Sequence, residues 1–289
     1  MGGRKSSPGI ARLAVVLTAA LTVVGPAVAR PLDEVTASGT LNVVAYVDNA
    51  PFSYDDNGTA RGIDVDLAHA LARELGVKAE IVLRMQGEEV DDDLRANVWK
   101  GPLTGGIVGD LMLHVPVDRD LALRNREVVI GNAYFEERVG LAIHPELTGD
   151  DPTFDVFLKD RKVGVQLATV SDYFLMTYKD GALIPNIAHH LKAEQGAKEF
   201  AQKDVAALMG VRSKIEALLA QEGVAARFVE PDMTGIVRRS WLVGMAWKEN
   251  SRDLGYAVQA ALEKIQTSGE LEKICKAHGV AYTPPPPPK

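Results

Sequence analysis

The 289-residue chain has one cysteine, no run of basic residues and, beyond its first thirty positions, no long hydrophobic stretch. A single cysteine excludes an intrachain disulfide scaffold. The formal net charge of −7 and the missing basic run argue against nucleic-acid binding. By contrast, 46% of the residues are hydrophobic, which is enough to build a folded core and argues against disorder. The length suggests about two domains.

The first thirty residues have their own pattern. Arg4, Lys5 and Arg12 precede an uncharged run over residues 13–24, and small residues follow up to Ala29. This order predicts a secretory signal peptide that is cut after Ala29. Twelve helical residues would span only about 18 Å of a hydrocarbon core that is about 30 Å thick, so a membrane anchor is disfavoured. The exported chain would begin at Arg30 with a formal charge of −10.

The remaining chain alternates between short apolar runs and amphipathic segments. Residues 62–75 repeat apolar side chains every four positions before Gly76, which predicts a helix. Cys275 shares helical spacing with Leu271 and Ile274, which indicates a buried core position. Alternating strands and helices predict an α/β fold with parallel sheets. Further strands are expected at 40–47, 77–83, 110–115, 128–130, 139–143, 162–166, 205–211, 226–229 and 241–247, further helices at 91–98, 173–176, 214–219, 251–265 and 271–278, and an extended proline tail at 284–288.

The motifs in this order resemble the family 3 periplasmic solute-binding proteins of the polar amino-acid-binding type. The first strand is followed by Pro51-Phe52, a turn, and a helix start with Gly62, Asp64 and Asp66. The similarity continues through 111–134, 163–166 and the last two helices, and so covers residues 36–282.

The resemblance implies two α/β lobes of the type II periplasmic binding-protein class, with ligand held in the cleft between them. Two segments would cross between the lobes, near 134–141 and 239–245. The implied organisation is a signal peptide at 1–29, a discontinuous first lobe at 33–133 plus 243–282, a second lobe at 134–242 and a proline-rich tail at 283–289. It also implies a periplasmic location and an inner-membrane ABC permease as partner.

Two arginines are candidates for holding a negatively charged ligand. In the family, an arginine after the third strand grips the ligand's carboxylate, and Arg119 matches it, although the family's threonine is replaced by Pro116. A planar guanidinium donates two parallel hydrogen bonds to a carboxylate. The alternative is a surface arginine paired with a neighbouring aspartate.

The second lobe departs from the family where an acid normally binds the ligand's ammonium group. Val211 stands at that position and Arg212 follows it, while a register that starts at Asp204 puts Met209 there instead. A buried ammonium without a partner costs several kcal/mol. Arg119 and Arg212 together would therefore favour a ligand with two or more carboxylates, unless Arg212 merely begins the next helix.

Other residues are expected near the cleft. Aromatic rings such as those of Trp99 and Trp241 can sandwich a planar ligand and stack with arginine. These two tryptophans could equally be core or hinge packing. His114 is expected to donate a hydrogen bond, and His189-His190 to be a solvated face, so no metal site is predicted. The full set of candidate ligand residues is Tyr46, Asp48, Phe52, Trp99, His114, Arg119, Gln166, Thr169, Arg212, Arg239 and Trp241.

Residues 91–101 and 110–118 are similar to a subgroup found with quinoprotein alcohol dehydrogenases. This similarity favours pyrroloquinoline quinone, a planar tricarboxylate, as a transported ligand and not as a catalytic cofactor. Two alternatives remain: a transport receptor for a polar amino acid, and an accessory protein that docks on a quinoprotein dehydrogenase. An enzyme is not expected, because the sequence has no catalytic triad, metal spacing or phosphate loop. Glu88, Glu89 and His114 could act as acid and base, but nothing in their spacing requires it.

Overall fold

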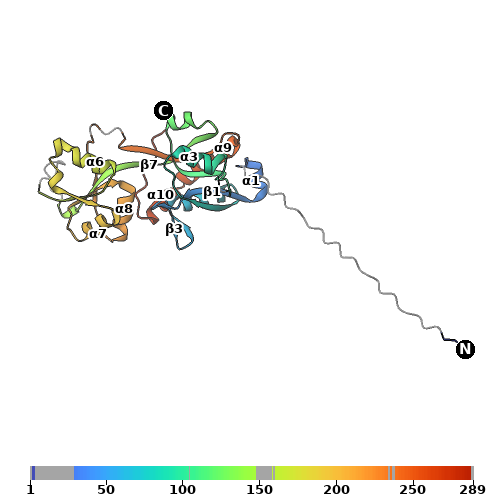
Figure 1. The fold of residues 1–289 in the computed structure, drawn as a ribbon, viewed down its shortest axis with the longest axis horizontal. Helices are drawn as coiled ribbons and strands as arrows, with labels where there is room; N and C mark the ends of the chain where they lie inside the picture. Colours follow the sequence, from blue (N-terminus) through green and yellow to red (C-terminus); the bar gives the residue numbers. More distant parts are fainter. Residues whose placement is uncertain are drawn as a thin grey trace.

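The computed structural model describes residues 2–3, 29–103, 105–147, 158, 160–233, 235 and 238–287. The predicted signal peptide lies outside the described residues except for positions 2–3 and 29. Figure 1 shows two groups of elements joined by long strands. Helices α6 (Val170–Thr177), α7 (Ala193–Ala201) and α8 (Arg212–Gln221) gather at one end, and α1 (Leu32–Ser38) and α9 (Arg252–Thr267) lie at the other.

The sheet of the first lobe is mixed. β1 (Thr40–Tyr46) pairs in parallel with β5 (Lys78–Arg84) and with β6 (Leu111–Pro116). β12 (Ser240–Lys248) pairs antiparallel with β6 and with β7 (Val128–Ile143). The prediction of parallel sheets is therefore wrong for this part of the sheet, because β12, which returns from the other lobe, runs against β6 and β7.

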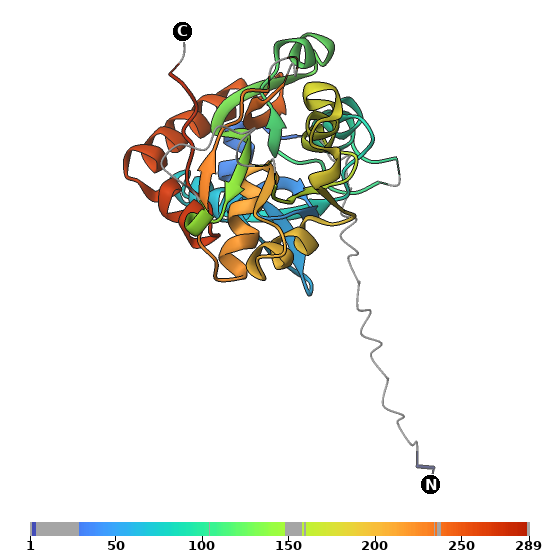
Figure 2. The same ribbon diagram turned by 90° about the vertical axis from the view of Figure 1, so that its left-hand side faces the viewer.

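Helices cover both faces of this sheet. On one face, α2 (Ile63–Glu74), α9 and α10 (Glu270–Ala277) enclose a core that includes fully buried Leu67, Leu71 and Cys275. In Figure 2, α9 and α10 lie together on one side of the strands. The other face is covered by α3 (Val90–Leu94) and the π-helix η1 (Arg95–Trp99), with α4 (Arg119–Arg124) beside them. The predicted helix at 62–75 and the buried position of Cys275 are confirmed.

The second lobe has its own sheet. β10 (Ala207–Val211) pairs antiparallel with the end of β7 and parallel with β8 (Val163–Gln166), and β9 (Ile187–His190) and β11 (Arg227–Val229) form the edges. Helix α6 packs with one hydrophobic cluster, and α7 and α8 with another. Three short 3-10 segments complete this lobe, η2 (Pro145–Leu147), η3 (Tyr178–Gly181) and η4 (Ile184–Asn186).

Strand β7 is continuous through both lobes. Its residues up to Arg138 pair with β12, and from Val139 onward they pair with β10. The prediction of two separate strands at 128–130 and 139–143 is therefore wrong, because the residues between them continue the ladder with β12. The change of partner lies within the segments expected to cross between lobes, and the lobe limits given above stay a prediction.

A small hairpin sheet leads into α2. Strands β2 (Asp48–Asn49), β3 (Ser53–Asp56) and β4 (Thr59–Arg61) form this sheet. Gly62 follows with a φ of 121°, and a Cβ at this position would lie 2.2 Å from the carbonyl oxygen of Phe52. Only glycine fits this close approach of two backbone segments.

No helix among the described residues is long and apolar enough to cross a lipid bilayer.

Candidate ligand-binding cleft

A cleft of about 510 Å³ lies between the two lobes. The first lobe contributes Ala50, Pro51 and Tyr54, which precede or belong to the hairpin sheet. The second lobe contributes Glu194 at the start of α7 and, from α8, Lys214 and Leu218. The end of α10 and the two residues after it close one side through residues 276–279. Both lobes thus line one cavity, as a ligand held between hinged domains requires.

A smaller pocket of about 80 Å³ adjoins this cleft within the second lobe. It lies where β8 and β10 end and α6 and α8 begin, and it shares Lys214 and Leu218 with the cleft. None of the described residues that line it is acidic. Its polar lining consists of Gln166, Thr169, Ser171, His190 and Lys214, and the rest is apolar or glycine. Such a lining favours a ligand that brings a negatively charged group and an apolar body.

The turn between β8 and α6 is held in place by its own hydrogen bonds. Thr169 is the N-cap of α6: its Oγ1 accepts from the Asp172 backbone N–H at 3.2 Å and donates to the Gln166 carbonyl at 2.8 Å. The Ala168 N–H donates to Asp172 Oδ2 at 3.0 Å. This arrangement presents the first turn of α6 to the pocket, and a helix N-terminus attracts anions. Gln166 and Thr169 are the predicted ligand residues that the structure places here.

Lys214 is the basic residue of this pocket. Its side chain is half-buried, and it forms no hydrogen bond or ion pair with any residue in the described part of the chain. Arg212 does not line the pocket. Its Nε lies 2.7 Å from Glu216 Oε1, and its guanidinium lies 5.2 Å from the centroid of the Phe228 ring.

In the first lobe, Phe52 and His114 lie in contact. Their ring centroids are 4.4 Å apart, and Phe52 is 2% exposed. The His114 backbone N–H donates to the Tyr134 hydroxyl, which donates to Asp64 Oδ1 at 2.6 Å. Burial, followed by the charge of Asp64, raises the pKa of Tyr134 well above its ordinary value. His114 Nδ1 lies 3.3 Å from Asp64 Oδ2 without hydrogen-bond geometry. Phe52 is thus a core residue, and only His114 reaches the surface.

Arg119 begins α4 and is exposed, and no partner for it exists among the described residues. The alternative of an ion pair with Asp118 is not seen. Asp118 instead caps α4 by accepting from the N–H groups of Asp120 and Leu121, and it pairs with Arg238 at 3.0 Å. The Leu121 N–H and the Arg238 guanidinium lower the pKa of Asp118. Arg119 is not among the described residues that line the cleft or the pocket, and its role in ligand binding stays a prediction.

The remaining candidates lie in packing or exposed positions. The Tyr46 hydroxyl donates to buried Asp93 at 2.8 Å, and burial raises the pKa of Tyr46 strongly. Trp99 packs in the same cluster as Tyr46, on the α3 face of the sheet. Trp241 packs against the cores of both lobes, which agrees with the hinge-packing alternative. Asp48 and Arg239 are exposed, and Arg239 lies 3.9 Å from Asp232.

The two adjacent histidines belong to the second lobe. His189 lies 3.0 Å from Asp172, and His190 is buried beside Glu199 at 3.5 Å. The prediction of a solvated face is wrong for His190, whose side chain is 7% exposed. Within the described ranges, no group of three His, Cys, Asp or Glu side chains is placed to hold a metal ion.

Comparison with known proteins agrees with this geometry. Residues 41–99, from β1 through η1, match the model of the bacterial extracellular solute-binding proteins, family 3. No curated protein matches the chain.

Solved structures match over nearly the whole chain. Two structures of an ancestral amino acid-binding protein, described as cationic amino acid-binding in one and as a precursor of cyclohexadienyl dehydratase in the other, are 24% and 25% identical to this chain. Their TM-scores are 0.64 and 0.51, and both comparisons cover 86% of this chain and 99% of the other.

Two further neighbours are a substrate binding protein and a solute receptor. A polar amino acid ABC uptake transporter substrate binding protein from Streptococcus thermophilus is 15% identical, with a TM-score of 0.68 over 86% of this chain and 90% of that one. The unliganded, open L-cystine solute receptor of Neisseria gonorrhoeae is 16% identical, with a TM-score of 0.63 over 88% and 98%. The chain therefore has the two-lobed type II periplasmic binding-protein fold.

Proposed function

We propose that this protein is an extracytoplasmic receptor that captures a polar amino acid, or a closely related small carboxylate, between its lobes and delivers it to an ABC permease. The observation that carries the proposal is the cleft lined by both lobes, which shares Lys214 with the pocket at the start of α6 and is also lined by Glu194, so that a base and an acid are present for the two charges of an amino acid. The family match and the descriptions of the structural neighbours support the amino-acid class.

The pocket also suggests an order of preference among amino acids. The first turn of α6 and the unpaired Lys214 both attract negative charge, and no acid lines the pocket to receive a cation. We therefore expect L-glutamate and L-glutamine to bind more tightly than L-arginine, whose guanidinium would approach Lys214.

Pyrroloquinoline quinone was the ligand favoured by the sequence. The neighbours' descriptions refer to amino acids, and they support the amino-acid alternative better. Two of the aromatic residues expected to sandwich a planar ligand are also used elsewhere, because Tyr46 and Trp99 pack in a core cluster of the first lobe. Docking on a quinoprotein dehydrogenase stays a prediction without a structural observation in its favour.

Titration calorimetry of the chain from Arg30 onward tests the proposal. The panel consists of L-glutamate, L-glutamine, L-arginine, L-cystine and pyrroloquinoline quinone, at low ionic strength. We expect saturable heat with at least one amino acid and a preference for L-glutamate over L-arginine. Binding of the quinone alone would restore the sequence-based ligand, and no heat with any amino acid would contradict the proposal.

A further inference from the structure

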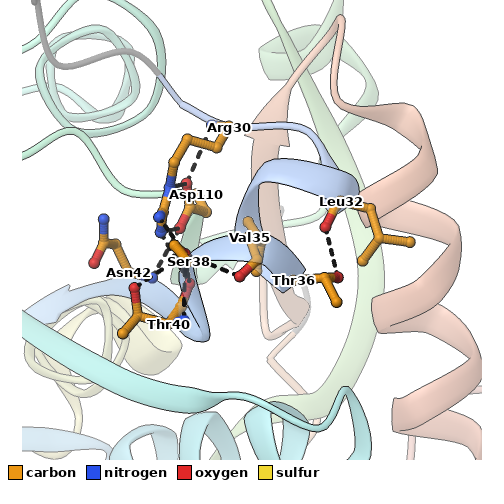
Figure 3. Close-up of polar contacts among 8 residues, drawn as sticks. All are labelled: Arg30, Leu32, Val35, Thr36, Ser38, Thr40, Asn42 and Asp110. Carbon is orange, nitrogen blue, oxygen red and sulfur yellow. Dashed lines mark hydrogen bonds and ion pairs between the residues drawn. The ribbon is translucent and has the colours of Figure 1, made fainter.

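Arg30 is tied to the first lobe through both its backbone nitrogen and its guanidinium (Figure 3). The backbone N donates to Asp110 Oδ1 at 3.1 Å, the side-chain Nε donates to the same oxygen at 3.0 Å, and Nη2 donates to Oδ2 at 2.6 Å. The Asp110 side chain is 0% exposed. It also accepts from the Asn42 backbone N–H at 2.8 Å. A fully buried carboxylate is thus held by four donors, three of which belong to Arg30.

The remaining guanidinium contacts fix Arg30 to the first helix and strand. Nη1 donates to Ser38 Oγ at 2.7 Å, and Nη2 donates to the Thr40 carbonyl at 3.0 Å. Ser38 ends α1 and Thr40 begins β1, while Asp110 directly precedes β6. One residue near the start of the described fold therefore joins three elements of the first lobe. The side-chain hydrogen bonds to Asp110 raise the pKa of Arg30 further, so this guanidinium stays charged.

This anchor coincides with the predicted cut. The sequence pattern places signal-peptide cleavage after Ala29, and Arg30 is the next residue. Hydrolysis adds the hydroxyl of water to the Ala29 carbonyl carbon, and the electron pair of the broken C–N bond stays on the Arg30 nitrogen. That nitrogen takes up protons and becomes an ammonium group at neutral pH.

We propose that the Ala29–Arg30 bond is the processing site of this chain and that the new α-ammonium of Arg30 binds the buried carboxylate of Asp110. Before the cut, the Arg30 nitrogen offers Asp110 a neutral N–H. After the cut it offers a positively charged donor, which adds a charge–charge attraction to a hydrogen bond whose acceptor is already ionised. Removal of the leader therefore strengthens the first lobe, independently of any ligand.

The first experiment compares N-termini. One version of the protein begins at Arg30, a second keeps Val28 and Ala29, and a third begins at Arg30 with an acetylated amine. We expect the extended and acetylated versions to melt about 2–4 °C below the first, a typical shift for one lost contact in a chain of this size. In the Asp110→Asn variant, the version that begins at Arg30 and the version that keeps Val28 and Ala29 should have nearly equal melting temperatures. If that variant does not fold, Arg30→Gln, which keeps both the ammonium and Asp110, should retain the difference.

The second experiment measures the amine itself. An amine-reactive ester at neutral pH should label the Arg30 α-amine at least tenfold more slowly in the native protein than in urea. A mass spectrum of the exported protein should show a chain that begins at Arg30. Equal melting temperatures for the first two versions, equal labelling rates, or a different first residue would each overturn the proposal.

Discussion

At the scale of single residues, Lys214 is the most informative side chain in the cleft. It is half-buried and lines both the cleft and the smaller pocket of the second lobe. It has no hydrogen-bond or ion-pair partner in the described part of the chain. A positive group in such a position gains more from meeting an anion than an exposed lysine does, because screening by water is weaker.

Replacing Lys214 by Gln should therefore weaken binding of a negatively charged ligand. We expect a loss of about tenfold or more, the usual scale for a hydrogen bond to a charged group. Calorimetry with L-glutamate measures it. The matched controls are Lys198→Gln on the exposed face of α7 and Arg212→Gln, whose guanidinium is held by Glu216 and Phe228. A larger loss for Arg212→Gln than for Lys214→Gln would contradict the assignment.

Glu137 makes the stability of the protein depend on pH. It lies on β7 where the chain passes between lobes, is 3% exposed, and accepts from the Ser213 hydroxyl of α8. Burial raises its pKa to about 7, and the Ser213 hydrogen bond opposes that change. An acid whose pKa is raised by folding contributes stability below its unfolded pKa and loses it as the pH rises through the folded pKa.

The free energy of unfolding should therefore fall between pH 4.5 and about pH 7, the ordinary and the folded pKa of Glu137, and change little above that, because Glu137 ionises in a buried site. Glu137→Gln keeps an acceptor for Ser213 and removes this loss, so it should be more stable than the unmodified protein at pH 8 by on the order of 1–3 kcal/mol. Urea unfolding of both proteins at about pH 5 and about pH 8 measures the difference. Exposed Glu222→Gln serves as the control, and equal behaviour of the two variants would contradict the assignment.

At the same scale, the candidate site was only partly predictable. Gln166 and Thr169 were predicted because the first ends a recognisable strand and the second follows it. Arg212 was predicted and Lys214 was missed, because a motif gives a position in the chain but not the direction of a side chain. Residues two apart on a helix point to nearly opposite sides. In the structure α8 begins at Arg212, and Lys214 is the residue of the two that lines the cleft.

At the scale of elements, the junction between the hairpin sheet and α2 determines the shape of the first lobe's cleft edge. The Asp64 N–H donates to the Phe52 carbonyl at 2.8 Å, and Gly62 lies against the same carbonyl. Gly58, in the hairpin turn, also has a positive φ, but an added Cβ would meet nothing within 4 Å.

The two glycines form a matched pair. Gly62→Ala should destabilise the protein by roughly 2 kcal/mol or more, because it adds a backbone clash to the unfavourable φ. Gly58→Ala should cost only about 1 kcal/mol, from the φ alone. Urea denaturation compares them. A Gly58→Ala cost equal to that of Gly62→Ala would show that the close approach at Phe52 contributes nothing.

Most elements follow from hydrophobic periodicity, as the predicted helix at 62–75 and the strand at 40–47 illustrate. Periodicity did not predict that β7 is one strand over 16 residues. Its middle, from Asn132 to Arg138, mixes polar side chains with the buried Tyr134 and Phe135, and its pattern does not alternate as a strand's would. Those residues are extended because β12 supplies an antiparallel partner more than a hundred positions later, and a local pattern carries no such information.

At the scale of the whole molecule, β7 and β12 are the strands that link the lobes. The Val139 N–H donates to the Arg239 carbonyl at 2.9 Å, so the two crossing strands stay paired where β7 changes sheets. Among the described residues the lobes also meet elsewhere: buried Ala217 of α8 packs with the first-lobe core, the Ala281 N–H donates to Glu216 at 2.8 Å, and Asp118 pairs with Arg238 at the surface. Lobes joined by a narrow pair of strands can rotate as rigid bodies around a bound ligand.

Small-angle X-ray scattering of the chain from Arg30 onward, with and without the amino acid that binds in calorimetry, tests this account most directly. If the ligand bridges the lobes, its addition should lower the radius of gyration, and Lys214→Gln should shift that change to higher ligand concentration. An unchanged radius of gyration at saturating ligand would contradict a receptor that closes around its solute.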